Sequence, residues 1–186
     1  MELATSHLKS ITYNFSDFVK SGTVRPKSCD VNRIIFESIN IMSDLSKHKN
    51  IDIMFDGIKD SGVVWDTDKI RQALVNFIKN SIEAIDIDDE EKNITITVKE
   101  NQFKKGYIDI NILDNGCGIP KHIKDKVFNS FVTSKEGGTG IGMTICDKII
   151  SSHGGEITIV DSNSNGTNLL ITLPRFFVQE GGKFHG

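Results

Sequence analysis

The spacing of the apolar residues switches along this chain between a helical period and a strand period. Apolar side chains recur every three or four positions in a segment capped by Asp30 and reaching about Leu45, and again in 68–85 and 143–152, which predicts three amphipathic helices. The segments predicted as strands are 51–56, 63–65, 94–99, 107–113, 156–161 and 168–173. Since helices do not separate every pair of strands, we expect an α+β chain. It should form a two-layer α/β sandwich, with a mixed sheet covered by helices on one face, and not a doubly wound dinucleotide fold.

The buried side of the first predicted helix should carry Val31, Ile34, Ile35, Ile41, Met42 and Leu45. The buried side of the second should carry Ile70, Ala73, Leu74, Phe77 and Ile78. A further amphipathic helix is expected over residues 5–20, ahead of a linker signal at 22–26. We therefore divide the chain into residues 1–25, a main domain at 26–176 and a tail at 177–186.

Charge and composition exclude several classes of protein. The chain has 186 residues, and its 22 basic and 25 acidic residues leave a net charge of −3, which argues against nucleic-acid binding by bulk charge. No segment is apolar enough to span a bilayer, and Met1–Lys20 lacks the apolar core of a signal peptide. The 3 cysteines are scattered, so neither a disulfide framework nor a zinc site is expected. We expect a cytoplasmic location, where thiols stay reduced.

The first candidate site lies on the helix predicted at 68–85. Asn76 and Asn80 are four positions apart, so both project from one face of that helix. Carboxamide oxygens suit a hard cation such as Mg²⁺. The alternative is that both are ordinary surface or capping amides.

Two glycine-punctuated segments form the second and third candidates. Asp114–Pro120 (DNGCGIP) follows a predicted strand, where a carboxylate can accept a hydrogen bond from an amine; the alternative is a simple turn. Gly137–Gly142 (GGTGIG) opens a helix at Met143, where backbone N–H groups can converge on phosphate oxygens. No Gly-Lys-Ser/Thr follows, so this is not a P-loop, and no strand directly precedes it, so it is not a Rossmann fingerprint.

The segment between these sites, 126–135 (KVFNSFVTSK), carries Phe128, Phe131 and Lys135. The two phenylalanines either pin an otherwise loose loop or are ordinary core residues. Lys135 either reaches a phosphate as a point charge or is simply solvated.

Taken together and in order, these segments resemble the ATP-binding domain of sensor histidine kinases, within the superfamily that includes DNA gyrase, Hsp90 and MutL. The similarity covers about residues 30–175. The matching segments are DTDKIRQALVNFIKNSIEAI (N box), DNGCGIP (G1 box), VFNSFVTSK (F box), GGTGIGMTIC (G2 box) and HGGEITIVDSNSNGTNLLITLP (closing strands).

The resemblance implies roles for individual residues. Asn80 would coordinate Mg²⁺ beside the phosphates of ATP, with Asn76 next to it, and Asp114 would accept from the adenine amine, supported by Thr167 through water. Residues 121–137 would form a lid over the nucleotide, and Lys135 is a candidate for the γ-phosphate. Gly116 and Gly118 would lie near the base, and Gly138, Gly140 and Gly142 would wrap the triphosphate. The other residues expected at the nucleotide are Ile119, Phe131, Thr139 and Ile141.

The residue at position 76 bears on the activity that the resemblance implies. Superfamily members that hydrolyse ATP or phosphorylate serine have Glu at the position where this chain has Asn76. A carboxamide cannot activate a water molecule, whereas neutral imidazole is already a nucleophile. The resemblance therefore favours a protein histidine kinase in two-component signalling. Alternatives kept open are a degenerate nucleotide-binding module and a gyrase- or Hsp90-like ATPase.

No histidine in the chain stands in the phosphoacceptor context of that family. His7, the nearest candidate, lacks an acidic neighbour. We expect residues 1–25 to be part of the second helix of the dimerising hairpin, and the acceptor helix to be absent. Partners would be that hairpin of the same kinase and a response regulator. The full-length kinase, membrane-anchored or not, would be a homodimer, and this fragment a monomer or weak dimer.

The sequence departs from the family pattern at four of the quoted positions. Ser130 replaces the usual F-box proline, and Ile141 and Met143 replace leucines with little change in volume. Glu83 stands where many members have a basic residue, so the cation that contacts the γ-phosphate stays open.

Overall fold

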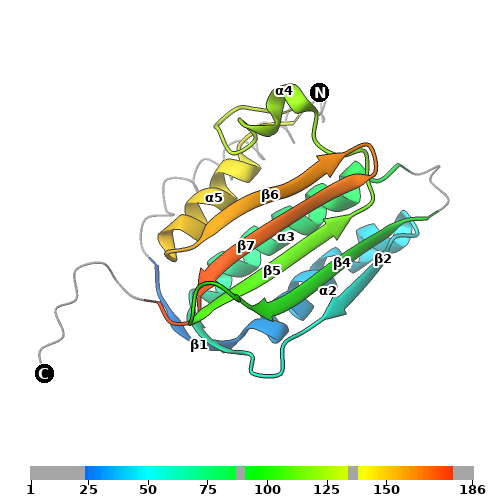
Figure 1. Ribbon diagram of the computed structural model, residues 1–186. Helices are drawn as coiled ribbons and strands as arrows, with labels where there is room; N and C mark the ends of the chain where they lie inside the picture. The colour runs from blue at the N-terminus through cyan, green and yellow to red at the C-terminus, as the bar shows by residue number, and fades with distance from the viewer. Residues whose placement is uncertain (1–23, 87–90, 134–137, 178–186) are drawn as a thin grey trace, which may run out of the picture.

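The structure is a computed structural model that describes residues 24–86, 91–133 and 138–177. Figure 1 shows the main sheet with the long helices behind one face. The helices are α2 (Val31–His48), α3 (Thr67–Ala84), α4 (Lys121–Lys124) and α5 (Gly142–Ser152). The strands are β1 (Lys27–Asp30), β2 (Asp52–Asp56), β3 (Gly62–Trp65), β4 (Asn93–Glu100), β5 (Tyr107–Asp114), β6 (Glu156–Asn163) and β7 (Gly166–Pro174).

The main sheet has the order β2-β4-β5-β7-β6. Strands β2 and β4 pair in parallel, and the other neighbours pair antiparallel. The prediction of a two-layer sandwich with a mixed sheet is thus confirmed. In this order β5 and β7 lie next to each other, so Asp114 at the end of β5 pairs with Thr167 at the start of β7.

The core lies between the sheet and the helices. Alternate residues of the central strands face it, for example Ile94 and Ile96 of β4 and Ile110 and Ile112 of β5, and all four are almost fully buried. They meet the apolar stripe of α3 and α5, which includes Ile70, Ala73, Leu74, Phe77, Ile78, Ile145 and Ile149. This burial fixes α3 across the sheet and so determines which of its faces is left for a site.

The helix boundaries follow side-chain caps that the sequence predicts. Asp30 accepts a hydrogen bond from the backbone N–H of Arg33 and caps α2. Asp66, one of two candidates, accepts from the N–H of Lys69 and caps α3.

Three details differ from the sequence-based expectation. Ile41 was expected to be buried, but 54% of it is exposed, because it lies at the edge of the α2 stripe that runs through Ile35 and Ser38. Strand β1 was not expected; its KSCD sequence has no alternation, and it forms by pairing with β3. The short helix α4 was not expected either, within the glycine-punctuated stretch.

The helix expected at residues 5–20 and the tail after residue 177 lie outside the described residues. In the part of the chain that the structure describes, no helix is long and apolar enough to cross a membrane.

Candidate functional site

Asp114 is the centre of the site on the sheet side. It ends β5, is 95% buried, and its carboxylate accepts three hydrogen bonds: 2.8 Å from the Ser81 hydroxyl, 3.1 Å from the N–H of Gly116 and 3.1 Å from the N–H of Thr167. These donors come from α3, the segment after β5, and β7. The three donors fix the carboxylate in place. Because a carboxylate oxygen can accept more than one hydrogen bond, Asp114 can also accept one from a ligand.

Thr167 contacts Asp114 directly, through its backbone N–H. The support through water that the resemblance implies is a separate contact and stays a prediction. The Thr167 hydroxyl lies 3.1 Å from the Ser162 hydroxyl oxygen, and that oxygen also accepts 2.7 Å from the N–H of Ile119. Ser162 thereby ties the segment containing Ile119 to β6 and β7.

Gly116 and Gly118 are surrounded by protein backbone. A Cβ atom at Gly116 would lie 2.6 Å from the carbonyl oxygen of Ala84, the last residue of α3. Gly118 has φ of +73°, and a Cβ there would overlap the carbonyl oxygen of Asn163. The fold itself requires both glycines, whatever further role they have beside a base.

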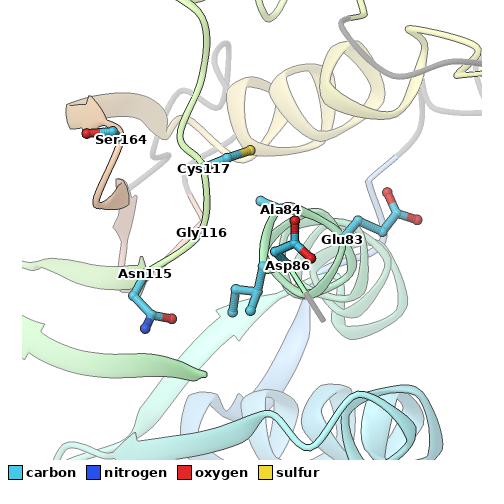
Figure 2. Close-up of a pocket in the computed structure, with 8 residues that line it drawn as sticks. Glu83, Ala84, Asp86, Asn115, Gly116, Cys117 and Ser164 are labelled. Atoms are coloured by element: carbon cyan, nitrogen blue, oxygen red, sulfur yellow. The ribbon is translucent and has the colours of Figure 1, made fainter. Parts of the chain in front are cut away.

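A pocket of about 380 Å³ lies beside this segment, at the end of α3. Figure 2 shows the carboxylates of Glu83 and Asp86 on the helix side and the thiol of Cys117 across from them. The full lining is Glu83, Ala84, Ile85, Asp86, Asn115, Gly116, Cys117 and Ser164. The N–H of Cys117 donates to the Ala84 carbonyl at 2.9 Å, which holds the segment against the helix end.

Asn76 and Asn80 both contact α5, in line with their expected position on one face of α3. The amide nitrogen of Asn80 donates to the Met143 sulfur at 3.2 Å. Asn76 hydrogen-bonds the Cys146 side chain. Burial raises the pKa of the Cys146 thiol to about 12, more than the Asn76 contact lowers it, so this thiol stays protonated and unreactive.

The segment from α4 to Thr133 is much less enclosed, since none of residues 121–133 is buried. Phe128 packs against the core, whereas 77% of Phe131 is exposed. Phe131 has φ of +67°, and its N–H donates to the Gly140 carbonyl at 2.9 Å. The interpretation as an ordinary core residue therefore holds for Phe128 and not for Phe131. Lys135 lies outside the described residues.

The glycine-rich segment reaches the helix through residues with different surroundings. Gly138 is exposed, while Thr139 is half-buried and its hydroxyl accepts from the N–H of Ile141 at 3.4 Å. Ile141 is buried with the core. Gly140, with φ of +64°, lies against the Phe131 backbone, but a Cβ at Gly142 would meet none of the described residues within 4 Å. The fold therefore does not require glycine at 142.

Sequence reasoning missed Ser81, Ser162 and the role of His153. Ser81 interrupts the apolar stripe of α3, and a buried hydroxyl needs a partner, so its position was a usable signal. His153 follows α5, as expected of a helix end, but it is also 99% buried and accepts from the N–H of Asp66 at 3.1 Å. It thus links the start of α3 to the end of α5, a contact that no local pattern indicates.

Comparison with known proteins decides the family. The family model described as histidine kinase-, DNA gyrase B-, and HSP90-like ATPase matches residues 65–176, which include Asp114, both asparagines and the glycine-rich segment. The chain belongs to this ATPase family. The predicted family and fold are confirmed, and an ATP-binding domain is the class of domain that the chain represents.

Two curated relatives are named as a sporulation kinase and a sensor protein. Sporulation kinase B of Bacillus subtilis is 31% identical over 89% of this chain and 38% of its own length. The sensor protein TdiS of Thauera aromatica is 31% identical over 92% of the chain and 32% of its own length. The chain therefore spans less than two fifths of each of these two relatives.

Solved structures agree with the sequence relatives. The catalytic domain of the histidine kinase ThkA is 30% identical, with a TM-score of 0.71 over 82% of this chain and 97% of that domain. ThkA in complex with the response regulator protein TrrA is 25% identical, with a TM-score of 0.74 over 93% of this chain and 49% of that one.

Proposed function

We propose that this chain is the ATP-binding catalytic domain of a two-component sensor histidine kinase. It transfers the γ-phosphoryl group of ATP to a histidine on a helical hairpin of the same kinase. The observation that carries the proposal is the buried Asp114 carboxylate, fixed by three donors at the end of β5. It lies in a chain of an ATPase family, with relatives named as a sporulation kinase and a sensor protein.

Asp114 binds the adenine base in this proposal. Its carboxylate accepts from the exocyclic amine while its three protein donors keep it in place. Ile119 and the backbone at Gly116 and Gly118 lie next to the base, and the glycine-rich segment around Gly140 lies next to the phosphates.

Mg²⁺ fits the residues present, with Asn80 as the protein ligand. The amide nitrogen of Asn80 is committed to Met143, so the carbonyl oxygen is the atom that can coordinate a cation. Within residues 24–86, 91–133 and 138–177, no three His, Cys, Asp or Glu side chains gather as a metal site. This matches a cation held by one protein oxygen plus phosphate and water oxygens. When bound, Mg²⁺ neutralises charge on the phosphates.

The chain positions the phosphate and leaves the nucleophile to the partner. An imidazole nitrogen attacks the γ-phosphorus, the bond from phosphorus to the β–γ bridging oxygen breaks, ADP departs, and the imidazole gives up its proton. Asn76 has no carboxylate with which to activate water, which disfavours hydrolysis. Lys135 is our candidate for the cation at the γ-phosphate.

The proposed organisation places the end of the second hairpin helix and a linker in residues 1–25, the catalytic domain in 26–176 and a tail in 177–186. The ThkA structure holds a response regulator, and we propose a response regulator as the partner of this kinase. We further propose a cytoplasmic domain within a homodimeric kinase, with this fragment alone a monomer or weak dimer.

The test is to incubate the chain with Mg²⁺ and γ-labelled ATP, alone and with the acceptor hairpin of the full-length kinase added in trans. We expect acid-labile label on the hairpin and none on the chain. Acid-labile label on the chain alone would place the acceptor among its own histidines, with His7 first to be tested. Steady phosphate release without a phosphoprotein would instead support the ATPase alternative.

A further inference from the structure

The contact between Asn80 and Met143 gives a direction to the Asn80 side chain. A carboxamide has a donor end and an acceptor end, and a thioether can only accept. The 3.2 Å contact therefore requires the amide nitrogen to face the sulfur, and the carbonyl oxygen faces away from it. The orientation of the Asn80 oxygen is thus set by a residue of another helix.

This contact is one of a row between α3 and α5. The Cys146 thiol donates to the Ala73 carbonyl at 3.7 Å and contacts the Asn76 side chain, and further along α3 the Asn80 amide reaches Met143. Residues 73, 76 and 80 share a face of α3, as 143 and 146 do on α5. Two sulfur-containing side chains therefore fix the face of α3 that carries both asparagines.

We propose that Met143 is a positioning residue for the metal ligand: its sulfur holds the Asn80 amide so that the carbonyl oxygen points to the Mg²⁺ of the bound nucleotide. This inference rests on the proposed function. Met143 is in the first turn of α5, directly after Gly142. The contact therefore also links Asn80 to the glycine-rich segment proposed to hold the phosphates.

Methionine adds an acceptor here that leucine, of similar volume, would lack, so M143L tests the acceptor at nearly constant packing. Thioether sulfur is a weak acceptor, so the expected effect is moderate. Losing one hydrogen bond of about 1 kcal/mol corresponds to about fivefold in affinity.

The test measures binding of ADP by calorimetry, with Mg²⁺ and with EDTA, for the whole chain and for M143L, M143Q and N80A. We expect M143L to weaken binding about fivefold with Mg²⁺ and to leave binding in EDTA unchanged. M143Q, whose side-chain oxygen can accept from Asn80, should restore most of the Mg²⁺-dependent part. N80A should abolish it.

Two results would overturn the role of Met143 alone: M143L binding Mg²⁺-ADP as tightly as the wild type, or M143Q binding as weakly as M143L although it melts normally. If the wild-type chain shows no Mg²⁺ effect, or N80A keeps it, the metal assignment itself fails and this inference with it. Should M143Q not fold, the side-chain amide resonances of Asn80 decide. They must shift between wild type and M143L, and unchanged resonances contradict the contact.

Discussion

The two sides of the candidate site are built in different ways. On the sheet side, Asp114, Ser81 and Thr167 are buried and joined by short hydrogen bonds from three separate elements. On the other side, in the segment proposed as the lid, none of residues 121–133 is buried, and 77% of Phe131 is exposed to solvent. The side that we propose for adenine is thus already fixed by protein contacts, while the described part of the proposed lid makes few of them.

This difference separates two kinds of sequence requirement. Where backbone packs on backbone, as at Gly118 against Asn163, the residue is fixed by the fold. Where the described residues leave the surroundings open, as at Gly142, packing does not require glycine, and a requirement for it would come from the proposed phosphates. Mutations on the two sides should therefore separate into those that lower stability and those that lower only binding.

The largest effect is expected for Asp114→Asn. The asparagine oxygen can still accept from the N–H groups of Gly116 and Thr167, and its nitrogen can donate to the Ser81 hydroxyl, so the fold should survive. A donor would then face the adenine amine, and we expect ADP affinity to fall by at least about 100-fold. Asp109→Asn, the same change on the outer face of β5, is the matched control and should bind normally. Unchanged affinity of Asp114→Asn would refute the adenine assignment.

Gly118→Ala and Gly142→Ala compare the two sides directly. At Gly118 the left-handed backbone and the Asn163 carbonyl both oppose a Cβ, so we expect a loss of about 2 kcal/mol in unfolding free energy. Gly142→Ala should melt at the same or a slightly higher temperature, because alanine favours the first turn of α5, while nucleotide affinity falls. Thermal melting followed by calorimetry measures both. Equal destabilisation by the two changes would remove the distinction drawn here.

The sequence predicted most of the fold and only part of the site. Alternating and helical periods located β4, β5 and α3 because their apolar residues face one continuous core. The motif Asp114–Pro120 located the acceptor, but not its donors, since Ser81 and Thr167 come from distant elements. Likewise the contact of Asn80 with Met143 depends on how α5 packs on α3, which no local pattern indicates.

A smaller, pH-dependent effect is expected from His153, which links the start of α3 to the end of α5. Burial lowers the pKa of His153 from its ordinary value of 6.5, so the folded state keeps the ring neutral. Its Nε2 accepts from the N–H of Asp66 and its Nδ1 donates to the Ile149 carbonyl, and a second ring proton would remove the acceptor.

The sign of this effect follows from proton uptake. Below pH 6.5 the unfolded chain binds a proton that the folded chain does not, so the contribution of His153 to stability is full above 6.5 and declines as the pH falls towards the lowered pKa of the folded state. We expect the melting temperature to drop between pH 7.5 and 5.5, and His153→Gln, which keeps a donor and an acceptor but does not titrate, to show a flatter profile. If the melting temperature of the variant falls with pH as steeply as that of the wild type, the pH dependence comes from other groups.

The smallest effect on stability is expected at the lid, for Phe131→Ala. The side chain is mostly exposed, and alanine meets the same positive φ as phenylalanine, so the unfolding free energy should change by less than about 0.5 kcal/mol. Phe128→Ala is the control three positions earlier: it removes a ring that packs on the core and should lower the melting temperature by several degrees. If Phe131 contacts the nucleotide, as the resemblance implies, ADP affinity should fall by about two- to fivefold without a change in melting, in keeping with a ring that only a ligand would cover. A drop in melting temperature comparable with that of Phe128→Ala would instead mean that the lid packs on the domain without ligand, and that the two sides of the site are less different than the described residues indicate.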